Sequence, residues 1–153
     1  VRRVHGAIGE AGQSVESDFA FDRIQRTPNS VSSHRLIRYA DHFIDVSPLV
    51  EQLFEAYFVE GNDIGDTNIL VEIGAAHGLD ATALRTYLES EADVSAIYEE
   101  NARAHRLGVN GVPAFAFQGS MVISGAQEPE VLVRVLDAAH AAATLERNSE
   151  ASQ

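Results

Sequence analysis

The sequence lacks cysteine and lysine, and each absence excludes a class of chemistry. Without cysteine, these 153 residues hold no thiolate nucleophile, no disulfide and no cysteine-ligated zinc or iron–sulfur site. Because all 11 basic residues are arginine, there is also no Schiff-base lysine and no phosphate-binding P-loop lysine. Any reaction that needs a cysteine thiol or a lysine amine must therefore take that group from outside this chain.

Positive charge is scarce as well. The chain carries 23 acidic residues against 11 basic ones, a formal net charge of -12, and its arginines are scattered. Phosphate backbones are bound by clustered Lys and Arg, so nucleic acid is not an expected partner. The acidity without lysine fits two origins equally well. It is typical of proteins adapted to high salt, and it also arises when a GC-rich genome encodes arginine in place of lysine.

A long hydrophobic run is missing too, so we expect no membrane span. No signal-peptide pattern is visible, which favours a cytoplasmic location. The only methionine is Met121 and the first residue is Val1, so we expect a processed product or a fragment. A composition of 45% hydrophobic residues and this length are typical of one globular domain.

Most of the chain before residue 108 carries helix signals. Five segments are expected to begin at the capping residues Asn29 or Ser30, Ser47 (followed by Pro48), Asp66, Asp80 and Ser90. Apolar side chains recur at helical spacing in each. They include Leu36, Tyr39, Ala40 and Phe43 in the first segment, and Leu49, Val50, Leu53, Phe54, Tyr57 and Phe58 in the second. Gly61, Gly78 and Gly108 are the expected stops.

After Gly108 the period changes to that of a strand. Alternation predicts a β-hairpin with strands from Val112 to Phe117 and from Met121 to Ser124, joined by a turn at residues 118–120. A last helix follows Pro129, and a frayed polar tail is expected from Thr144 to Gln153. An isolated hairpin is only marginally stable. The apolar residues Phe115, Phe117 and Ile123 indicate that the two strands are buried. We therefore expect them to pair with strands from outside this chain.

Metal and phosphate motifs are weak. The six histidines show no pair four residues apart, and each is expected to be a surface or capping residue. The group Glu60, Asn62, Asp63 and Asp66 resembles a cation loop only superficially, because it lacks EF-hand spacing. We therefore expect no metal site.

The most informative local stretch is Gly111-Val112-Pro113. By itself it favours an ordinary trans proline at the start of a strand, where no ladder donor is needed. Four blocks in order change that interpretation: residues 19–30 (FAFDRIQRTPNS), 53–66 (LFEAYFVEGNDIGD), 107–117 (LGVNGVPAFAF) and 123–132 (ISGAQEPEVL). In these blocks the chain resembles DsbA-type thioredoxin-fold oxidoreductases. It is most similar to the FrnE-like branch, which is related to 2-hydroxychromene-2-carboxylate isomerases and kappa-class glutathione transferases.

The resemblance implies an α/β thioredoxin-like fold with a helical insertion. Residues 1–143 would form a partial domain, with the insertion at about 1–108 and the hairpin and last helix at 109–143. The first strand, the active-site helix with its Cys-x-x-Cys pair and the second strand would be absent. Pro113 would be the cis-proline that faces the dithiol, and Gly111, Val112 and Pro113 would bind an extended thiol or disulfide protein substrate. No cofactor is implied.

Three functions stay open at this stage. The first is a thiol–disulfide oxidoreductase, of which this chain is an inactive fragment. The second is a glutathione-dependent isomerase or transferase, in which a serine replaces the nucleophilic cysteine and Asn29, Ala126 and Gln127 are candidate glutathione contacts. Those three residues also fit ordinary cap and loop roles. The third is a cysteine-free, non-catalytic binding or dimerisation module. A homodimer is one expected partner arrangement.

Overall fold

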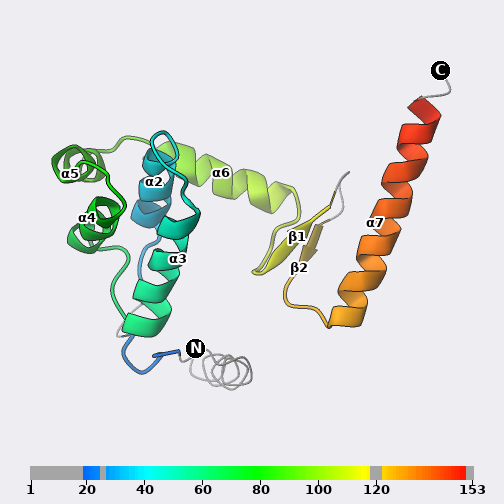
Figure 1. The fold of residues 1–153 in the computed structure, drawn as a ribbon, viewed down its shortest axis with the longest axis horizontal. Helices are drawn as coiled ribbons and strands as arrows, with labels where there is room; N and C mark the ends of the chain where they lie inside the picture. The colour runs from blue at the N-terminus through cyan, green and yellow to red at the C-terminus, as the bar shows by residue number, and fades with distance from the viewer. Residues whose placement is uncertain (1–18, 25–26, 118–121, 151–153) are drawn as a thin grey trace. The chain divides into compact units, whose positions relative to one another are not determined.

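The computed structural model describes residues 19–24, 27–117 and 122–150. The chain divides into two compact units, Val1–Tyr98 and Glu99–Gln153, and each is described here by itself. The first is helical, and the second contains a hairpin and a long C-terminal helix (Figure 1). Within the described residues, no helix combines the length and the apolarity that crossing a membrane requires.

The helical unit is built from short helices around two central ones. Its elements are α2 (Val31–Ala40), α3 (Ser47–Glu55), the π-helix η1 (Ala56–Glu60), α4 (Thr67–Ala76) and α5 (Ala81–Glu89). The helix α6 (Val94–Arg106) begins in this unit and continues into the next. Helices α2 and α4 pack against each other, and each of them also packs against α3 and α5.

The core of this unit is aliphatic. Leu36, Leu49, Leu70 and Leu84 are fully buried, one each from α2, α3, α4 and α5. A Cβ atom added at Gly74 would clash with Leu84 Cδ2, so α4 and α5 approach too closely for a side chain there. The apolar stripes of the sequence therefore do face one shared core, as amphipathic spacing predicts.

The predicted caps at Asp66 and Asp80 are confirmed. The Asp66 carboxylate accepts a hydrogen bond from the Asn68 N–H at 2.7 Å, and the Asp80 carboxylate accepts one from the Ala83 N–H at 2.7 Å. Gly61 ends η1 with φ of 78°, in the left-handed region that glycine adopts at no steric cost. Local sequence rules therefore suffice for these helix ends.

The predicted cap at Ser47 is wrong by one residue. Ser47 is the first residue of α3 and Val46 is its N-cap. The Asp45 carboxylate supplies the capping acceptor, since it receives hydrogen bonds from the Ser47 N–H at 3.0 Å and the Ser47 hydroxyl at 2.9 Å. These bonds lower the pKa of Asp45.

The cap predicted at Ser90 is also wrong, because α6 begins only at Val94. The Ser90 hydroxyl instead donates to the Tyr87 carbonyl at 2.7 Å and accepts from the Ala92 N–H at 3.1 Å, so it closes α5. Phe43 likewise lies beyond its predicted helix. The helix α2 ends at Ala40, and the Phe43 ring is 64% exposed in the following turn, 5.1 Å from the ring of Tyr39.

In the second unit, strands β1 (Ala114–Ala116) and β2 (Val122–Ser124) form an antiparallel pair in which Phe115 faces Ile123. They are shorter than the strands predicted from Val112 and from Met121. Proline has no N–H for a ladder, so β1 begins after Pro113. Phe115 and Ile123 are half-buried rather than enclosed. The predicted turn at residues 118–120 and Met121 lie outside the described residues.

The last helix is longer than expected. The helix α7 (Pro129–Glu150) includes most of the segment that the sequence suggested was a frayed tail. Residues 144–150 contain no glycine or proline, and Leu145, Glu146 and Arg147 are good helix formers. Polarity alone therefore does not end this helix.

Candidate functional site

The candidate binding loop joins α6 to β1 and consists of residues 107–113. It leaves α6 at Gly108, whose φ is 94°, and the N–H groups of Leu107 and Gly108 donate to carbonyls of the last helical turn. The Val109 N–H still donates to the Ala104 carbonyl at 3.0 Å. The predicted stop at Gly108 is thus confirmed, because glycine can take the left-handed conformation that reverses the chain here.

Ser124, at the end of β2, ties this loop to the hairpin. Its hydroxyl donates to the Gly108 carbonyl at 3.0 Å and accepts from the Asn110 N–H at 3.1 Å. The Asn110 amide donates to the same carbonyl at 3.3 Å. One side chain therefore holds both ends of the turn that precedes Gly111.

The tip of the loop is open. The Val112 side chain is 88% exposed, and a Cβ atom added at Gly111 would meet nothing within 4 Å. Within the described part of the chain, the Val112 N–H and C=O form no hydrogen bond. The Val112–Pro113 peptide bond is cis, the isomer that the resemblance implies. An extended polypeptide can therefore reach the free backbone groups of Val112.

Two of the three weaker candidates lie beside this tip. The Gly125 N–H donates to the Pro113 carbonyl at 2.7 Å, which places Ala126 and Gln127 at the same end of the hairpin as Pro113. Asn29 belongs to the helical unit, where its side-chain oxygen accepts from the Val31 N–H at 3.1 Å at the start of α2. Asn29 thus has the capping role that the sequence left open for it.

The model of the DSBA-like thioredoxin domain matches residues 1–137 of this sequence. The chain belongs to the DSBA-like thioredoxin domain family. This confirms the predicted fold class, and the helices, the single hairpin and the last helix are the parts of that fold described above. A search of curated proteins gave no match. At a coarse level the family is one of thiol–disulfide oxidoreductases, yet this DSBA-like domain contains no cysteine.

A second polar site in the DSBA-like domain surrounds Arg35 and was missed by sequence reasoning. Arg35 is only 3% exposed, and its guanidinium donates to four main-chain carbonyls at 2.7–3.0 Å. They belong to Tyr87, Leu88, Ser90 and Ala92, at and just beyond the end of α5. A fixed positive charge satisfies carbonyls that the helix leaves unpaired and opposes the negative end of its dipole.

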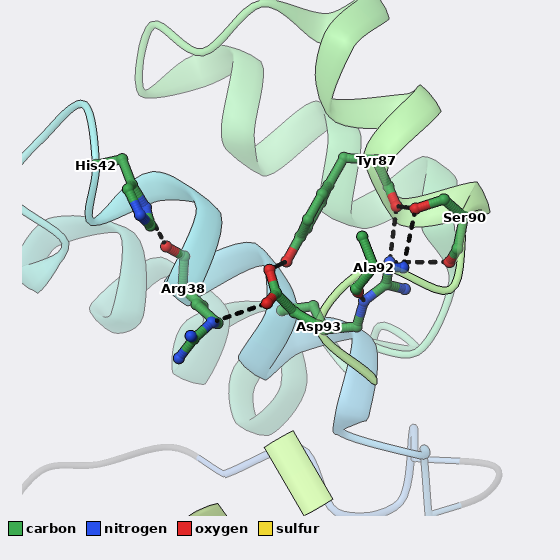
Figure 2. Close-up of polar contacts among 7 residues, drawn as sticks. Arg38, His42, Tyr87, Ser90, Ala92 and Asp93 are labelled. Carbon is green, nitrogen blue, oxygen red and sulfur yellow. Dashed lines mark hydrogen bonds and ion pairs between the residues drawn. The ribbon is translucent and has the colours of Figure 1, made fainter. Parts of the chain in front are cut away.

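Tyr87 and Asp93 extend this network (Figure 2). The Tyr87 hydroxyl donates to Asp93 Oδ2 at 2.9 Å, and Asp93 Oδ1 lies 3.3 Å from Arg38 Nε. Burial and then the Asp93 carboxylate raise the pKa of Tyr87 to about 12. The hydrogen bond from Tyr87 lowers the pKa of Asp93, and Arg38 acts in the same direction. Tyr87 is therefore a permanent donor and Asp93 a permanent acceptor near neutral pH.

The chemistry of this network is structural. All four carbonyls that Arg35 contacts are main-chain groups, and the Arg35 guanidinium also lies 4.9 Å from the centre of the Tyr87 ring. One feature of the sequence could have indicated that Arg35 is buried. Arg35 precedes Tyr39 by four residues, so it lies on the apolar stripe of α2. A buried arginine on such a stripe needs a partner that only long-range contacts supply.

The acidic segment after η1 has ordinary structural roles. The Asn62 amide donates to Glu60 Oε2 at 2.7 Å, and Asp63 Oδ1 accepts from the Gly65 N–H at 2.9 Å. Asp66 caps α4. Among the described residues no three His, Asp or Glu side chains gather as metal ligands would.

Proposed function

We propose that this DSBA-like domain is the substrate-binding part of a thiol–disulfide oxidoreductase of the FrnE-like branch. The observation that carries the proposal is the family match over residues 1–137, taken together with the open Val112 backbone at the tip of the loop. The redox dithiol is supplied by polypeptide outside these residues. Alone, the 153-residue chain has no exchange activity, because it has no thiol.

The exchange step follows ordinary thiol chemistry. A thiolate attacks one sulfur of a substrate disulfide, the other substrate sulfur leaves as a thiolate, and a mixed disulfide forms. The role of this chain in that step is positioning. The Val112 N–H and C=O bind the extended substrate backbone in the manner of an added strand, and the loop is held in place by Ser124.

A second candidate is the glutathione-dependent isomerase or transferase branch. The observation that favours it is the Gly125–Pro113 hydrogen bond, which brings Gln127 to the end of the hairpin where Val112 is exposed. A tripeptide could then bind the Val112 backbone and the Gln127 amide together. Here the nucleophile outside these residues would be a serine.

The binding role is tested with a matched pair of variants. Val112→Pro removes the backbone N–H, whereas Val112→Ala removes most of the side chain and leaves the backbone intact. Binding of a labelled, extended cysteine peptide with a blocked thiol is followed by fluorescence anisotropy, with S-methylglutathione as competitor. We expect the proline variant to lose binding and the alanine variant to keep it.

Equal binding by both variants would contradict the backbone contact. Strong competition by S-methylglutathione, with little peptide binding, would support the glutathione branch instead. The nucleophile itself is tested by expressing the natural reading frame that contains this sequence. We expect a Cys-x-x-Cys pair with insulin-reducing activity. A serine at that position would favour the second candidate. If neither residue is present, the non-catalytic module is the remaining hypothesis.

A further inference from the structure

The helical unit contains a cavity that neither the loop nor the Arg35 network uses. It has a volume of about 310 Å³ and lies between α2, α3, η1 and the segment before α2. Its walls are mainly aliphatic and aromatic: Ile37, Val50, Leu53, Phe54, Tyr57 and Phe58. This volume falls at the lower end of the range that is typical of small-molecule sites.

Three aromatic rings form one wall of the cavity. The rings of Phe54 and Phe58 are stacked, with centroids 6.1 Å apart and planes inclined by 24°. Tyr57 meets Phe58 edge to face at 4.8 Å. Tyr57 and Phe58 belong to the π-helix η1, a rare element that places these successive aromatic residues on the cavity. Such a wall suits a flat ring, because offset stacking and edge contacts add to the burial of apolar area.

The lining of the cavity also lacks acidic residues and arginine. None of its lining residues is Asp, Glu or Arg, although the whole chain carries 23 acidic and 11 basic residues. An ion that entered would lose its hydration without gaining a partner of opposite charge, which is costly. The lining therefore favours an occupant without formal charge.

Polar groups are few at this site. The Ser33 hydroxyl is already used, since it donates to the Ile64 carbonyl at 2.6 Å. Tyr57 and His34 also line the cavity, and neither side chain forms a hydrogen bond with another residue of the described ranges. They can fix the orientation of one polar group on a mostly apolar molecule.

We propose that this cavity binds a small, uncharged aromatic molecule that carries a single hydroxyl or amine. The rings of Phe54, Tyr57 and Phe58 contact the flat face and edge of the ligand, and the Tyr57 hydroxyl bonds its polar group. The site lies wholly within the helical unit, so it does not depend on the binding loop.

The test uses the full 153-residue chain and the uncharged fluorescent probe N-phenyl-1-naphthylamine. We expect saturable binding at one site and displacement by 2-naphthol. The matched anion 2-naphthoate should displace the probe at least about tenfold less well, because no arginine lines the cavity to pair with its carboxylate. N-acetyltyrosinamide tests whether the cavity instead takes the side chain of a peptide.

A pair of matched variants locates the site. Phe54 and Phe43 are 59% and 64% exposed, and each ring contacts another ring, but only Phe54 lines the cavity. Phe54→Ala should weaken probe binding roughly tenfold, and Phe43→Ala by less than about twofold. Circular dichroism and urea unfolding show whether each variant is folded.

Tyr57→Phe keeps the ring and removes only the hydroxyl, so it tests the polar contact should Phe54→Ala unfold. It should weaken 2-naphthol binding by roughly fivefold, the effect of one hydrogen bond of about 1 kcal/mol. The absence of saturable binding, equal effects of Phe54→Ala and Phe43→Ala, equal displacement by naphthoate and naphthol, or stronger displacement by N-acetyltyrosinamide would each overturn the proposal.

Discussion

Asp93 combines an unusual backbone with a specific side-chain role. Its φ is 59°, a left-handed conformation that aspartate and asparagine tolerate better than most residues. Its carboxylate bridges Tyr87 on α5 and Arg38 on α2 just before α6 begins. Asp93 thus joins the neighbouring helices α5 and α6 to Arg38 on α2, which lies far earlier in the sequence, and both partners contact its charged carboxylate.

Asp93→Asn removes that charge and keeps a residue that tolerates the same backbone. The folded state lowers the pKa of Asp93, so its contribution to stability is fully present above the ordinary aspartate pKa of about 3.9. That contribution is lost as the pH falls through the lower, folded value. We expect the wild type to be more stable than Asp93→Asn near neutral pH, and the gap to close in acid, as measured by urea unfolding at several pH values.

Asp41→Asn is the control for this prediction. Asp41 is exposed, and its side chain forms no hydrogen bond or ion pair within the described ranges. The Asp41 variant should stay close to the wild type throughout. A gap between wild type and Asp93→Asn that is unchanged by pH would show that the charge of Asp93 is not what matters.

At the scale of elements, Arg35 joins α2 to the end of α5. One buried side chain donates to four carbonyls there, so a residue more than fifty positions away in the sequence adds to the local closure of α5 by Ser90. The caps at Asp66 and Asp80 act within three residues and were predictable for that reason. The contribution of Arg35 depends on how α2 packs, which no local pattern contains.

Arg35→Ala should lower the free energy of unfolding by about 2–3 kcal/mol, because it removes four hydrogen bonds from a buried guanidinium and leaves the buried Leu88 carbonyl without that donor. Arg35→Lys should lower it less, since an ammonium keeps the charge but lacks the planar fork of five donors. Urea unfolding of the two variants and the wild type measures both effects.

Arg38→Ala is the matched control on the same helix. Its bridge to Asp93 is at the surface, with the Arg38 side chain 39% exposed, so its removal should cost about 0–1 kcal/mol. If Arg35→Ala proved as mild as Arg38→Ala, water and Ser90 would suffice for the carbonyls at the end of α5, and Arg35 would not stabilise that end of the helix.

At the scale of the whole molecule, the net charge of -12 is the dominant electrostatic fact. Such a charge opposes compaction through self-repulsion, and salt screens it. The Debye length is about 10 Å at 0.1 M salt and about 3 Å at 1 M, so most of the screening of distant charges is complete well before molar salt.

We therefore expect the thermal unfolding midpoint to rise between low and moderate sodium chloride. A rise that continues steeply to molar salt would support adaptation to high salt, whereas a flat response would support the GC-rich explanation for the missing lysine. Sodium bromide at equal ionic strength is the control, because screening depends on ionic strength and not on the identity of the anion.

The excluded chemistry, the class of the fold and most helix ends could be predicted from the order of the amino acids. The absence of cysteine excludes a redox site within the chain, and Asp66, Asp80, Gly61 and Gly108 act within one turn of where they lie. The motif around Pro113 and the order of the four blocks likewise identified the family that the model of the DSBA-like domain matches.

The remaining features arise only when the chain is packed. The contacts of Arg35 with the end of α5, the Tyr87–Asp93–Arg38 bridge, the Ser124 tie and the aromatic cavity all join residues that are far apart along the chain or on different elements. The difference lies in the distance along the chain over which each kind of contact acts. Caps and turns satisfy backbone groups a few residues away, whereas a buried charge or a cavity is defined by whichever side chains packing brings together.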